Sequence, residues 1–255
     1  MTELARQTRY KTLSVAFHSV TVTYLISNKG SFYQYVICLL VGFAIQASAN
    51  LFNSLQVTND IKIKKATAVC FTLSVLAGSL AVIEKPFLIF FGLLALAISA
   101  GYSKKLSVLQ VRPSETVLAD LFILFSFGPI GTYGSFYFFG GTNFDEAVTL
   151  SVINGVFAHN LLWIHRIKDI EKDKASGKKT LAVRLGFGGS VLVFVLENLF
   201  AISLGISTFG YLKCFLAVSS MVALAFLLCQ KKFFESFHLW VLFLLLNPFF
   251  MAYLP

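Results

Sequence analysis

The sequence contains few charged residues and few residues that interrupt helices. Charged side chains make up 13% of its 255 residues, and aspartate and glutamate together number only 12. Soluble domains usually contain about 25% charged residues, so this composition excludes an ordinary soluble globular domain. With 17 glycines, 5 prolines and 57% hydrophobic residues, the chain is also neither a collagen-like repeat nor a disordered segment.

Cysteine is scarce as well. The four cysteines lie singly in or beside apolar stretches, without C-x-x-C spacing, at Cys38, Cys70, Cys214 and Cys229. This pattern excludes a secreted disulfide scaffold, and it indicates neither a zinc site nor a redox pair. We expect these cysteines to be small core residues.

The chain is rich in long apolar runs. A membrane-spanning helix needs about 20 predominantly apolar residues, with a lower limit near 17. Nine runs meet this requirement, at roughly residues 12–28, 31–56, 67–83, 86–102, 117–139, 146–164, 187–207, 209–230 and 236–254. The sequence therefore predicts an all-α transmembrane fold of nine helices, in a single polytopic domain over residues 1–255 that contacts a lipid bilayer.

Basic residues are divided unequally between the loops that join these runs. If the loops alternate between two sides, 18 of the 21 lysines and arginines lie on one side, and only Lys29, Lys85 and Lys213 lie on the other. Cytoplasmic loops carry the excess of basic residues, so we expect a cytoplasmic N-terminus and an external C-terminus in a bacterial-type inner membrane. The net charge of +9 is then mainly a topology signal, and it gives no reason to expect nucleic acid as a partner.

Two of the five aspartates, Asp169 and Asp173, lie four residues apart in the basic loop after the sixth run. If the sixth helix continues through Asp173, the two carboxylates share one helix face and repel each other. Mg²⁺ would compensate this repulsion, because it commonly binds one or two carboxylates together with substrate phosphates. A polyphosphate would suit the surrounding lysines Lys168, Lys172, Lys174, Lys178 and Lys179. The alternative is a solvated loop in which these acids and lysines pair with one another.

The string D-I-E-x-D-x-x-x-G-K-x-T-L-A-V-R-L-G over residues 169–186 resembles the second aspartate motif of the UbiA superfamily of intramembrane prenyltransferases. It is most similar to that motif in the 1,4-dihydroxy-2-naphthoate polyprenyltransferases. Other segments resemble the same enzymes in order and spacing: Arg9 to Leu13, Gln46 to Asn53, Tyr102-Ser103, Glu115, Phe127 to Gly134, and Asn160 to Leu162.

The resemblance implies nine transmembrane helices around a central cavity. It also implies transfer of a polyprenyl chain from its diphosphate to an aromatic acceptor such as dihydroxynaphthoate. Asp169 and Asp173 would be the catalytic carboxylates that hold Mg²⁺, and Lys178 and Arg184 would contact phosphate oxygens. By the same resemblance, further substrate contacts are expected from Asn50, Asn53, Tyr102 and Asn160.

The chain departs from the family pattern at the first aspartate motif, which normally reads N-D-x-x-D-x-x-x-D after the second helix. Asn53 is present, but the next residues are Ser54-Leu55-Gln56-Val57, so the first two aspartates are missing. The loop that follows is also shorter than in the family. Ahead of the second motif, His165-Arg166 replaces an expected pair of asparagines. These differences affect the metal-binding half of the chemistry.

Three interpretations therefore remain open. In the first, the chain is an active prenyltransferase in which one further acid and fixed positive charge replace part of the first motif; these residues are Asp60, Lys62, Lys64 and Lys65. In the second, the fold serves a related step, such as another aromatic acceptor or a cyclisation. In the third, the protein is a noncatalytic lipid-binding or partner subunit. The discriminating feature is whether Asp60, as a third metal ligand, reaches the cavity that faces the second motif.

Several other polar residues lie within the apolar runs, where ionisable groups are costly. Glu197-Asn198 in the seventh run is expected to face the bundle, either as a substrate contact or as an interhelix tie. Asp120 could bind the acceptor or lie at the interface with Arg112. We expect His159 to pack within its helix.

Overall fold

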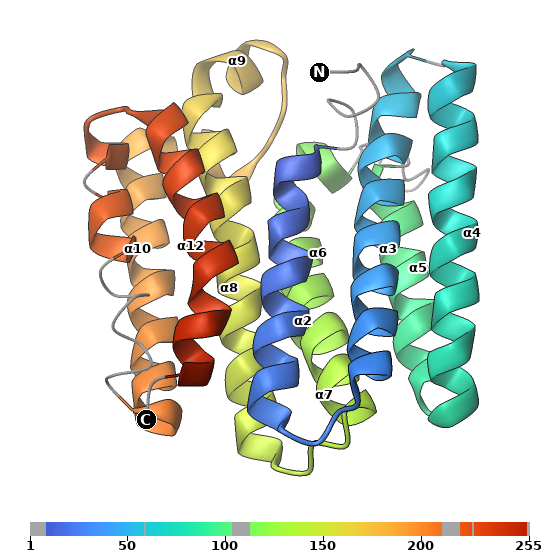
Figure 1. Ribbon diagram of the computed structural model, residues 1–255. Helices are drawn as coiled ribbons and strands as arrows, with labels where there is room; N and C mark the ends of the chain where they lie inside the picture. The colour runs from blue at the N-terminus through green and yellow to red at the C-terminus, as the bar shows by residue number, and fades with distance from the viewer. Residues whose placement is uncertain (1–8, 59, 104–112, 211–219, 226, 254–255) are drawn as a thin grey trace.

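The computed structural model describes residues 9–58, 60–103, 113–210, 220–225 and 227–253. These residues are almost entirely helical (Figure 1). The elements are η1 (Tyr10–Leu13), α2 (Ser14–Ser27), α3 (Phe32–Thr58), α4 (Ile61–Glu84), α5 (Leu88–Ser103), η2 (Pro113–Glu115), α6 (Leu118–Phe125), η3 (Ser126–Tyr133), α7 (Gly134–Phe138), α8 (Phe144–Lys168), α9 (Ile170–Ala175), α10 (Leu181–Phe209) and α12 (Phe233–Tyr253). A further apolar helix covers Ser220–Cys229, apart from residue 226.

Within the described ranges, helix is found at each of the nine predicted positions, which confirms the all-α membrane fold. Five helical segments are long and apolar enough to cross a membrane: those at residues 32–56, 61–84, 118–138, 144–168 and 181–209. Part of the predicted eighth run lies outside the described residues, as do Lys104, Lys105, Arg112, Lys213 and Cys214.

The helices run up and down between two ends of the bundle. The α3–α4 turn and the α9 segment lie at the upper end in Figure 1, and the α2–α3, α4–α5 and α7–α8 turns lie at the lower end. A hydrogen bond of 3.1 Å from Lys29 Nζ to Thr142 Oγ1 joins two of these lower turns. The alternation assumed for the basic residues is therefore present, and the strongly basic segments gather at the end that carries α9, called here the α9 end.

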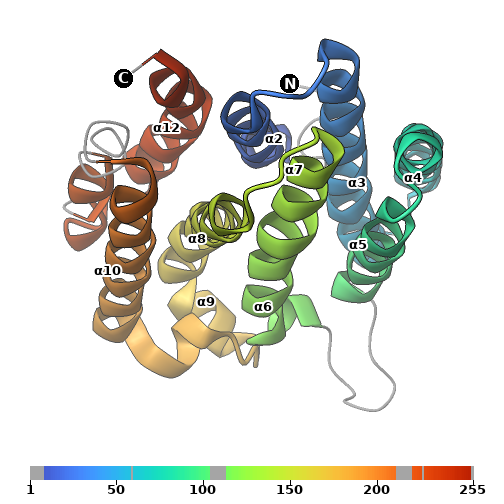
Figure 2. The same cartoon turned by 90° about the horizontal axis from the view of Figure 1, so that it is seen from below.

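Helix α8 occupies the middle of the bundle and contacts α6, η3, α10 and α12 (Figure 2). It is mostly buried, whereas α4 packs against α3 and α5 and leaves many apolar side chains exposed. The largest core cluster lies between α8, α10 and α12 and contains both tryptophans, Trp163 and Trp240. The Trp240 indole donates a 2.9 Å hydrogen bond to the Phe157 carbonyl, so this core is tied together by polar as well as apolar contacts.

Two helices begin six residues earlier than the apolar runs predicted, because polar caps start them. The third predicted helix begins at Ile61 rather than residue 67, since the Asp60 carboxylate accepts a 2.7 Å hydrogen bond from the Lys62 amide. The seventh begins at Leu181 rather than residue 187, with the Thr180 hydroxyl as its cap. A positive φ of 67° at Gly186 then kinks α10, a conformation that glycine adopts at little cost.

The fifth predicted span consists of α6, the π-helix η3 and α7. Proline 129 lies inside the π-helical part, where it donates no backbone hydrogen bond. The span also crosses α8 at two glycines. A Cβ atom placed on Gly128 would lie 2.6 Å from the Ser151 carbonyl oxygen, and one on Gly155 would lie 2.9 Å from that of Leu124. Only glycine permits so close an approach of the two backbones.

Candidate functional site

The second acidic motif lies at the α9 end, where α8 stops. Helix α8 ends at Lys168, Asp169 has non-helical dihedral angles, and α9 begins at Ile170. The sixth helix therefore does not continue through Asp173. Its continuation was the condition under which the sequence places both carboxylates on one helix face. The Asp173 amide nevertheless donates a 2.8 Å hydrogen bond to the Asp169 carbonyl. This bond keeps the two residues one turn apart.

Asp173 is buried and already has a cationic partner. Lys178 Nζ lies 2.6 Å from Asp173 Oδ1, and the Lys178 amide donates to the Asp173 carbonyl at 3.0 Å. The Lys178 side chain is 35% exposed, whereas that of Asp173 is 7% exposed. One acid–lysine pair of the solvated-loop interpretation is therefore present. Other basic residues near the motif are exposed: Lys168, Lys172, Lys174, Lys179 and Arg184.

The loop after α9 is held against the segment that precedes α6. The Lys179 amide donates a 3.0 Å hydrogen bond to the Glu115 carbonyl, and Thr116 and Lys179 form an isolated parallel bridge. The sequence resemblance singles out Glu115 and the second motif separately. The structure brings their backbones together.

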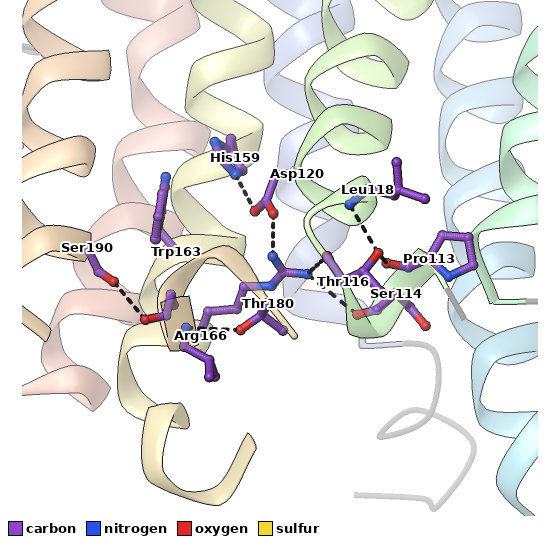
Figure 3. A network of polar contacts seen from close by, with 12 residues as sticks. Pro113, Ser114, Thr116, Leu118, Asp120, His159, Trp163, Arg166, Thr180 and Ser190 are labelled. Carbon is purple, nitrogen blue, oxygen red and sulfur yellow. Dashed lines mark hydrogen bonds and ion pairs between the residues drawn. The ribbon is translucent and has the colours of Figure 1, made fainter. Parts of the chain in front are cut away.

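Arg166, on helix α8, anchors this same segment (Figure 3). Its Nη1 lies 2.6 Å from Asp120 Oδ2, and its Nη2 donates to the carbonyls of Thr116 at 3.1 Å and Ser114 at 3.5 Å. Arg166 and Asp120 are both buried. A buried charge pair is favourable only if further hydrogen bonds satisfy its remaining donors, and the two carbonyls supply these.

The network continues from α6 through α8 to α10. His159 Nε2 lies 2.9 Å from Asp120 Oδ1, and its Nδ1 lies 3.0 Å from Glu197 Oε2. The Trp163 indole donates to the same Glu197 oxygen at 3.0 Å. His159 thus bridges two carboxylates on different helices, and four helical elements share one polar network.

Sequence reasoning missed most of this network. For Asp120, the sequence left open a contact with the acceptor or a place at the interface with Arg112, which lies outside the described residues. In the structure, Asp120 pairs with Arg166. The expectation that His159 simply packs within its helix was incomplete, because it bridges acids on two others. One signal was available: His159, Trp163 and Arg166 follow a spacing of four and then three residues, which places them on one face of α8.

Asn160 and Asn198 form a reciprocal amide pair between α8 and α10. Their side chains exchange hydrogen bonds of 2.8 and 2.9 Å, and both residues are fully buried. This geometry is the interhelix tie considered for Glu197-Asn198. Asn160 was predicted to contact substrate; its side chain here contacts Asn198, and a substrate contact stays a prediction.

The residues predicted for the first site lie around the α3–α4 turn, also at the α9 end (Figure 1). Asn50 Nδ2 lies 3.3 Å from Thr12 Oγ1, and Asn53 is half-buried one turn further along α3. Asp60 caps α4. Exposed positions on the first turn of that helix carry Lys62, Lys64 and Lys65. Tyr102 lies near the end of α5, close enough to Arg166 and Asp120 for their charges to act on its hydroxyl group.

The sequence model of the UbiA prenyltransferase family matches residues 55–239, which include the second acidic motif and the Asp120–His159–Glu197 network. The chain belongs to this family. The resemblance inferred from the motifs is thus confirmed.

Two relatives are named as 1,4-dihydroxy-2-naphthoate prenyltransferases, the class of enzyme that the motif resembles. This UbiA protein is 33% identical over 130 residues to 1,4-dihydroxy-2-naphthoate octaprenyltransferase of Haemophilus influenzae, covering 48% of this chain and 41% of that one. It is 31% identical over 96 residues to the Escherichia coli enzyme of that name, covering 33% of this chain and 31% of that one. The matched segments span less than half the length of either relative.

Solved structures of UbiA homologues have the same fold as this UbiA protein. The Archaeoglobus fulgidus homologue bound to GPP and Mg²⁺ superposes with a TM-score of 0.73 over 99% of this chain and all of that one, at 13% identity. The apo homologue from Aeropyrum pernix gives a TM-score of 0.69 over 96% of both chains, also at 13% identity. These likenesses confirm the all-α, UbiA-like membrane fold.

The acidic residues that the structure describes do not form an all-protein metal cage. Among the described residues, no three His, Cys, Asp or Glu side chains gather where they could hold one ion. The predicted trio of Asp60, Asp169 and Asp173 is therefore not assembled. The pair Asp169 and Asp173 still fits Mg²⁺, because this ion commonly takes one or two carboxylates and completes its shell with water and substrate phosphates.

An apolar pocket of about 510 Å³ lies between α5, the α6–η3 span and α8. Its walls are Phe91, Leu124, Phe125, Pro129, Tyr133, Phe144, Val148, Ser151, Val152, Gly155 and Val156. Such a lining excludes charged groups and can accommodate a hydrocarbon chain.

Proposed function

We propose that this UbiA protein transfers a polyprenyl chain from polyprenyl diphosphate to an aromatic acceptor of the dihydroxynaphthoate type, as in menaquinone synthesis. The observation that carries the proposal is the segment at one end of a UbiA bundle in which Asp169 lies one helical turn from the Asp173–Lys178 pair. Support for the acceptor comes from two relatives named 1,4-dihydroxy-2-naphthoate octaprenyltransferase. Support for the donor comes from a homologue solved with GPP and Mg²⁺.

Asp169 and Asp173 would hold Mg²⁺ together with the substrate diphosphate. When bound, the ion would neutralise the negative charge that grows on the diphosphate as it leaves. Lys178 now pairs with Asp173. On binding, it would exchange this carboxylate for a phosphate oxygen, and Arg184 would contribute a second positive charge. The lysine would thus balance the negative charge of Asp173 until the substrate binds.

In the reaction itself, the bond between the first prenyl carbon and the diphosphate oxygen breaks, and the oxygen keeps the electron pair. An electron-rich ring carbon attacks the allylic cation, forms the new carbon–carbon bond and then loses its own substituent, as H⁺ or as CO₂. The apolar walls of the bundle would exclude water from the cation. The pocket beside η3 is one place where the prenyl chain could lie.

The α3–α4 turn would supply the second half of the diphosphate site. Its family aspartates are missing here, and Lys62, Lys64 and Lys65 would bind phosphate directly in place of a second metal cluster. Asp60 would hold the start of α4 in place, since its carboxylate caps that helix. Asn50, Asn53 and Tyr102 would line the approach of the substrate.

A second candidate function is a noncatalytic protein that binds isoprenoid lipids. It is favoured by the Asp173–Lys178 pair and by the dispersed acids of the described residues. Both candidates share the same location, an inner membrane with the α9 end in the cytoplasm. In both, the chain forms a single domain.

A magnesium-dependent assay tests the proposal. Membranes containing the protein are incubated with dihydroxynaphthoate and prenyl diphosphates of several lengths, and the prenylated product is measured. Asp169→Asn or Asp173→Asn should each abolish nearly all product formation, and the double variant should lose little more, because residues that act as one unit are not additive.

Asp145→Asn is the matched control, since Asp145 is exposed at the opposite end of the bundle. It should leave the rate unchanged. If the folded wild-type protein binds prenyl diphosphate but forms no product with any donor, the noncatalytic function is the correct one. Additive losses in the double variant would instead indicate two independent salt bridges.

A further inference from the structure

The imidazole ring of His159 is enclosed between two acids from neighbouring helices. Its Nε2 lies 2.9 Å from Asp120 Oδ1 on α6 (Figure 3), and its Nδ1 lies 3.0 Å from Glu197 Oε2 on α10. The side chains of His159 and Asp120 are 1% and 4% exposed, and that of Glu197 is 25% exposed. Both ring nitrogens therefore face a carboxylate oxygen at hydrogen-bonding distance, in a place largely shielded from the surroundings of the bundle.

These two contacts set a minimum number of protons for the three groups. A neutral imidazole has one N–H, and its other nitrogen is an acceptor; an ionised carboxylate can only accept. If both acids were ionised and the ring were neutral, one of the two contacts would bring two acceptors together with no proton between them. Each contact needs its own proton, so the three groups hold one proton more than ionised acids and a neutral ring supply.

The additional proton belongs on the ring, because other donors already stabilise the ionised form of both acids. Arg166 Nη1 lies 2.6 Å from Asp120 Oδ2. The Trp163 indole can only donate, and it lies 3.0 Å from the same Glu197 oxygen that His159 contacts. Imidazole is also a stronger base than a carboxylate, with an ordinary pKa of about 6.5 against about 4.

The charge balance of the network leads to the same result. The charged side chains in contact with one another are Asp120 on α6, Glu197 on α10, and Arg166 and His159 on α8. Two more titratable groups lie nearby: Tyr102, whose phenol is neutral at about pH 7, and the exposed Arg9, whose charge is screened by water and ions. With a charged ring, two positive and two negative groups cancel. With a neutral ring, one buried negative charge would lack a partner, which is costly.

We propose that Asp120, His159 and Glu197 form a buried proton-binding site, in which His159 is an imidazolium between two ionised acids. The bound proton allows both acids to stay charged and Asp120 to stay paired with Arg166. Through the contact of Arg166 with the Thr116 carbonyl, the site supports the segment against which the loop after α9 rests. The site needs neither substrate nor metal, so it stands independently of the prenyl transfer proposed above.

Solid-state ¹⁵N NMR tests the site in the full-length protein, labelled with ¹⁵N-histidine and reconstituted in lipid bilayers at about pH 7.5, where a histidine in water is mostly neutral. An imidazolium has two protonated ring nitrogens with similar chemical shifts, whereas a neutral ring has one protonated and one bare nitrogen with widely separated shifts. The His159 signal is identified by its contact with labelled Trp163, since the two ring centroids lie 5.4 Å apart, and by its loss in His159→Gln. We expect two protonated nitrogens at His159.

Glu197→Gln tests the contribution of the second acid. A glutamine amide can donate to a bare Nδ1, so the additional proton is no longer needed and the His159 ring should become neutral at the same pH. Glu84→Gln is the matched control, since Glu84 is exposed at the end of α4, and it should leave His159 charged. A neutral His159 in the wild-type protein, or an imidazolium that persists in folded Glu197→Gln, would overturn the proposal. If Glu197→Gln does not fold, the wild-type spectrum decides by itself.

Discussion

At the scale of single residues, Arg166 is where the chain differs most informatively from its family. It stands in a position where the motif normally has asparagine, and its guanidinium joins α8 to Asp120 and to the carbonyls of residues 114 and 116. It therefore holds the segment against which the loop after α9 rests. We infer that Arg166 positions the second motif and does not itself contact substrate.

Arg166→Met should destabilise the protein by about 3–5 kcal/mol, because it leaves the Asp120 charge buried and without its partner. Thermal unfolding in detergent, followed by loss of monodisperse protein, measures the effect. Lys168→Met on the same helix is the control, since Lys168 is exposed, and it should leave the midpoint unchanged. Adding Asp120→Leu to Arg166→Met should restore part of the loss; no recovery would contradict the charge-pair explanation.

The three lysines of the α3–α4 turn give a second prediction at this scale. Replacing Lys62, Lys64 and Lys65 together by Gln should raise the Kd for prenyl diphosphate about tenfold or more, because charged hydrogen bonds contribute roughly 1.5–3 kcal/mol each before screening. Isothermal titration should also show saturation at one Mg²⁺ per wild-type protein. Lys29→Gln, at the opposite end of the bundle, should have no effect. Unchanged affinity in a correctly inserted triple variant would mean that these lysines serve topology alone.

At the scale of helices, the crossing of the π-helical span over α8 depends on Gly128 and Gly155. An alanine at either position would place its Cβ against a backbone carbonyl that cannot move aside. Overpacking of this kind typically costs about 1–3 kcal/mol, so each variant should unfold at a lower temperature. Gly92→Ala is the matched control, because a Cβ there meets no atom within 4 Å. Equal midpoints for all three variants would contradict the close-packing argument.

At the scale of the whole molecule, the uneven distribution of basic residues predicts the orientation in the membrane. Reporter fusions at Gly30, Thr142 and Pro255 should read as external, and a fusion at Gly177, beside α9, should read as cytoplasmic. Enzymatic reporters active on only one side of the membrane provide the measurement. A cytoplasmic result at Thr142 would invert the topology.

The positions and order of the helices in the described residues were predictable from the sequence, since apolar runs of sufficient length are the dominant signal in a membrane protein. The starts of α4 and α10 were not, because Asp60 and Thr180 extend these helices beyond their apolar runs. Pairs such as Asp120 with Arg166 and His159 with Glu197 could not be predicted either. Helices that are apolar on every side do not reveal which face turns toward which neighbour, and these contacts depend on that rotation.

The burial of both tryptophans also has an optical consequence. Trp163 and Trp240 are the only two in the chain, both are fully buried, and both belong to the core between α8, α10 and α12. The ultraviolet-excited tryptophan emission of the folded protein therefore comes from this core alone, at the short wavelengths of an apolar environment. The Trp163 indole donates a hydrogen bond to Glu197. The wavelength and intensity of the Trp163 emission therefore report on the polar network without an attached dye.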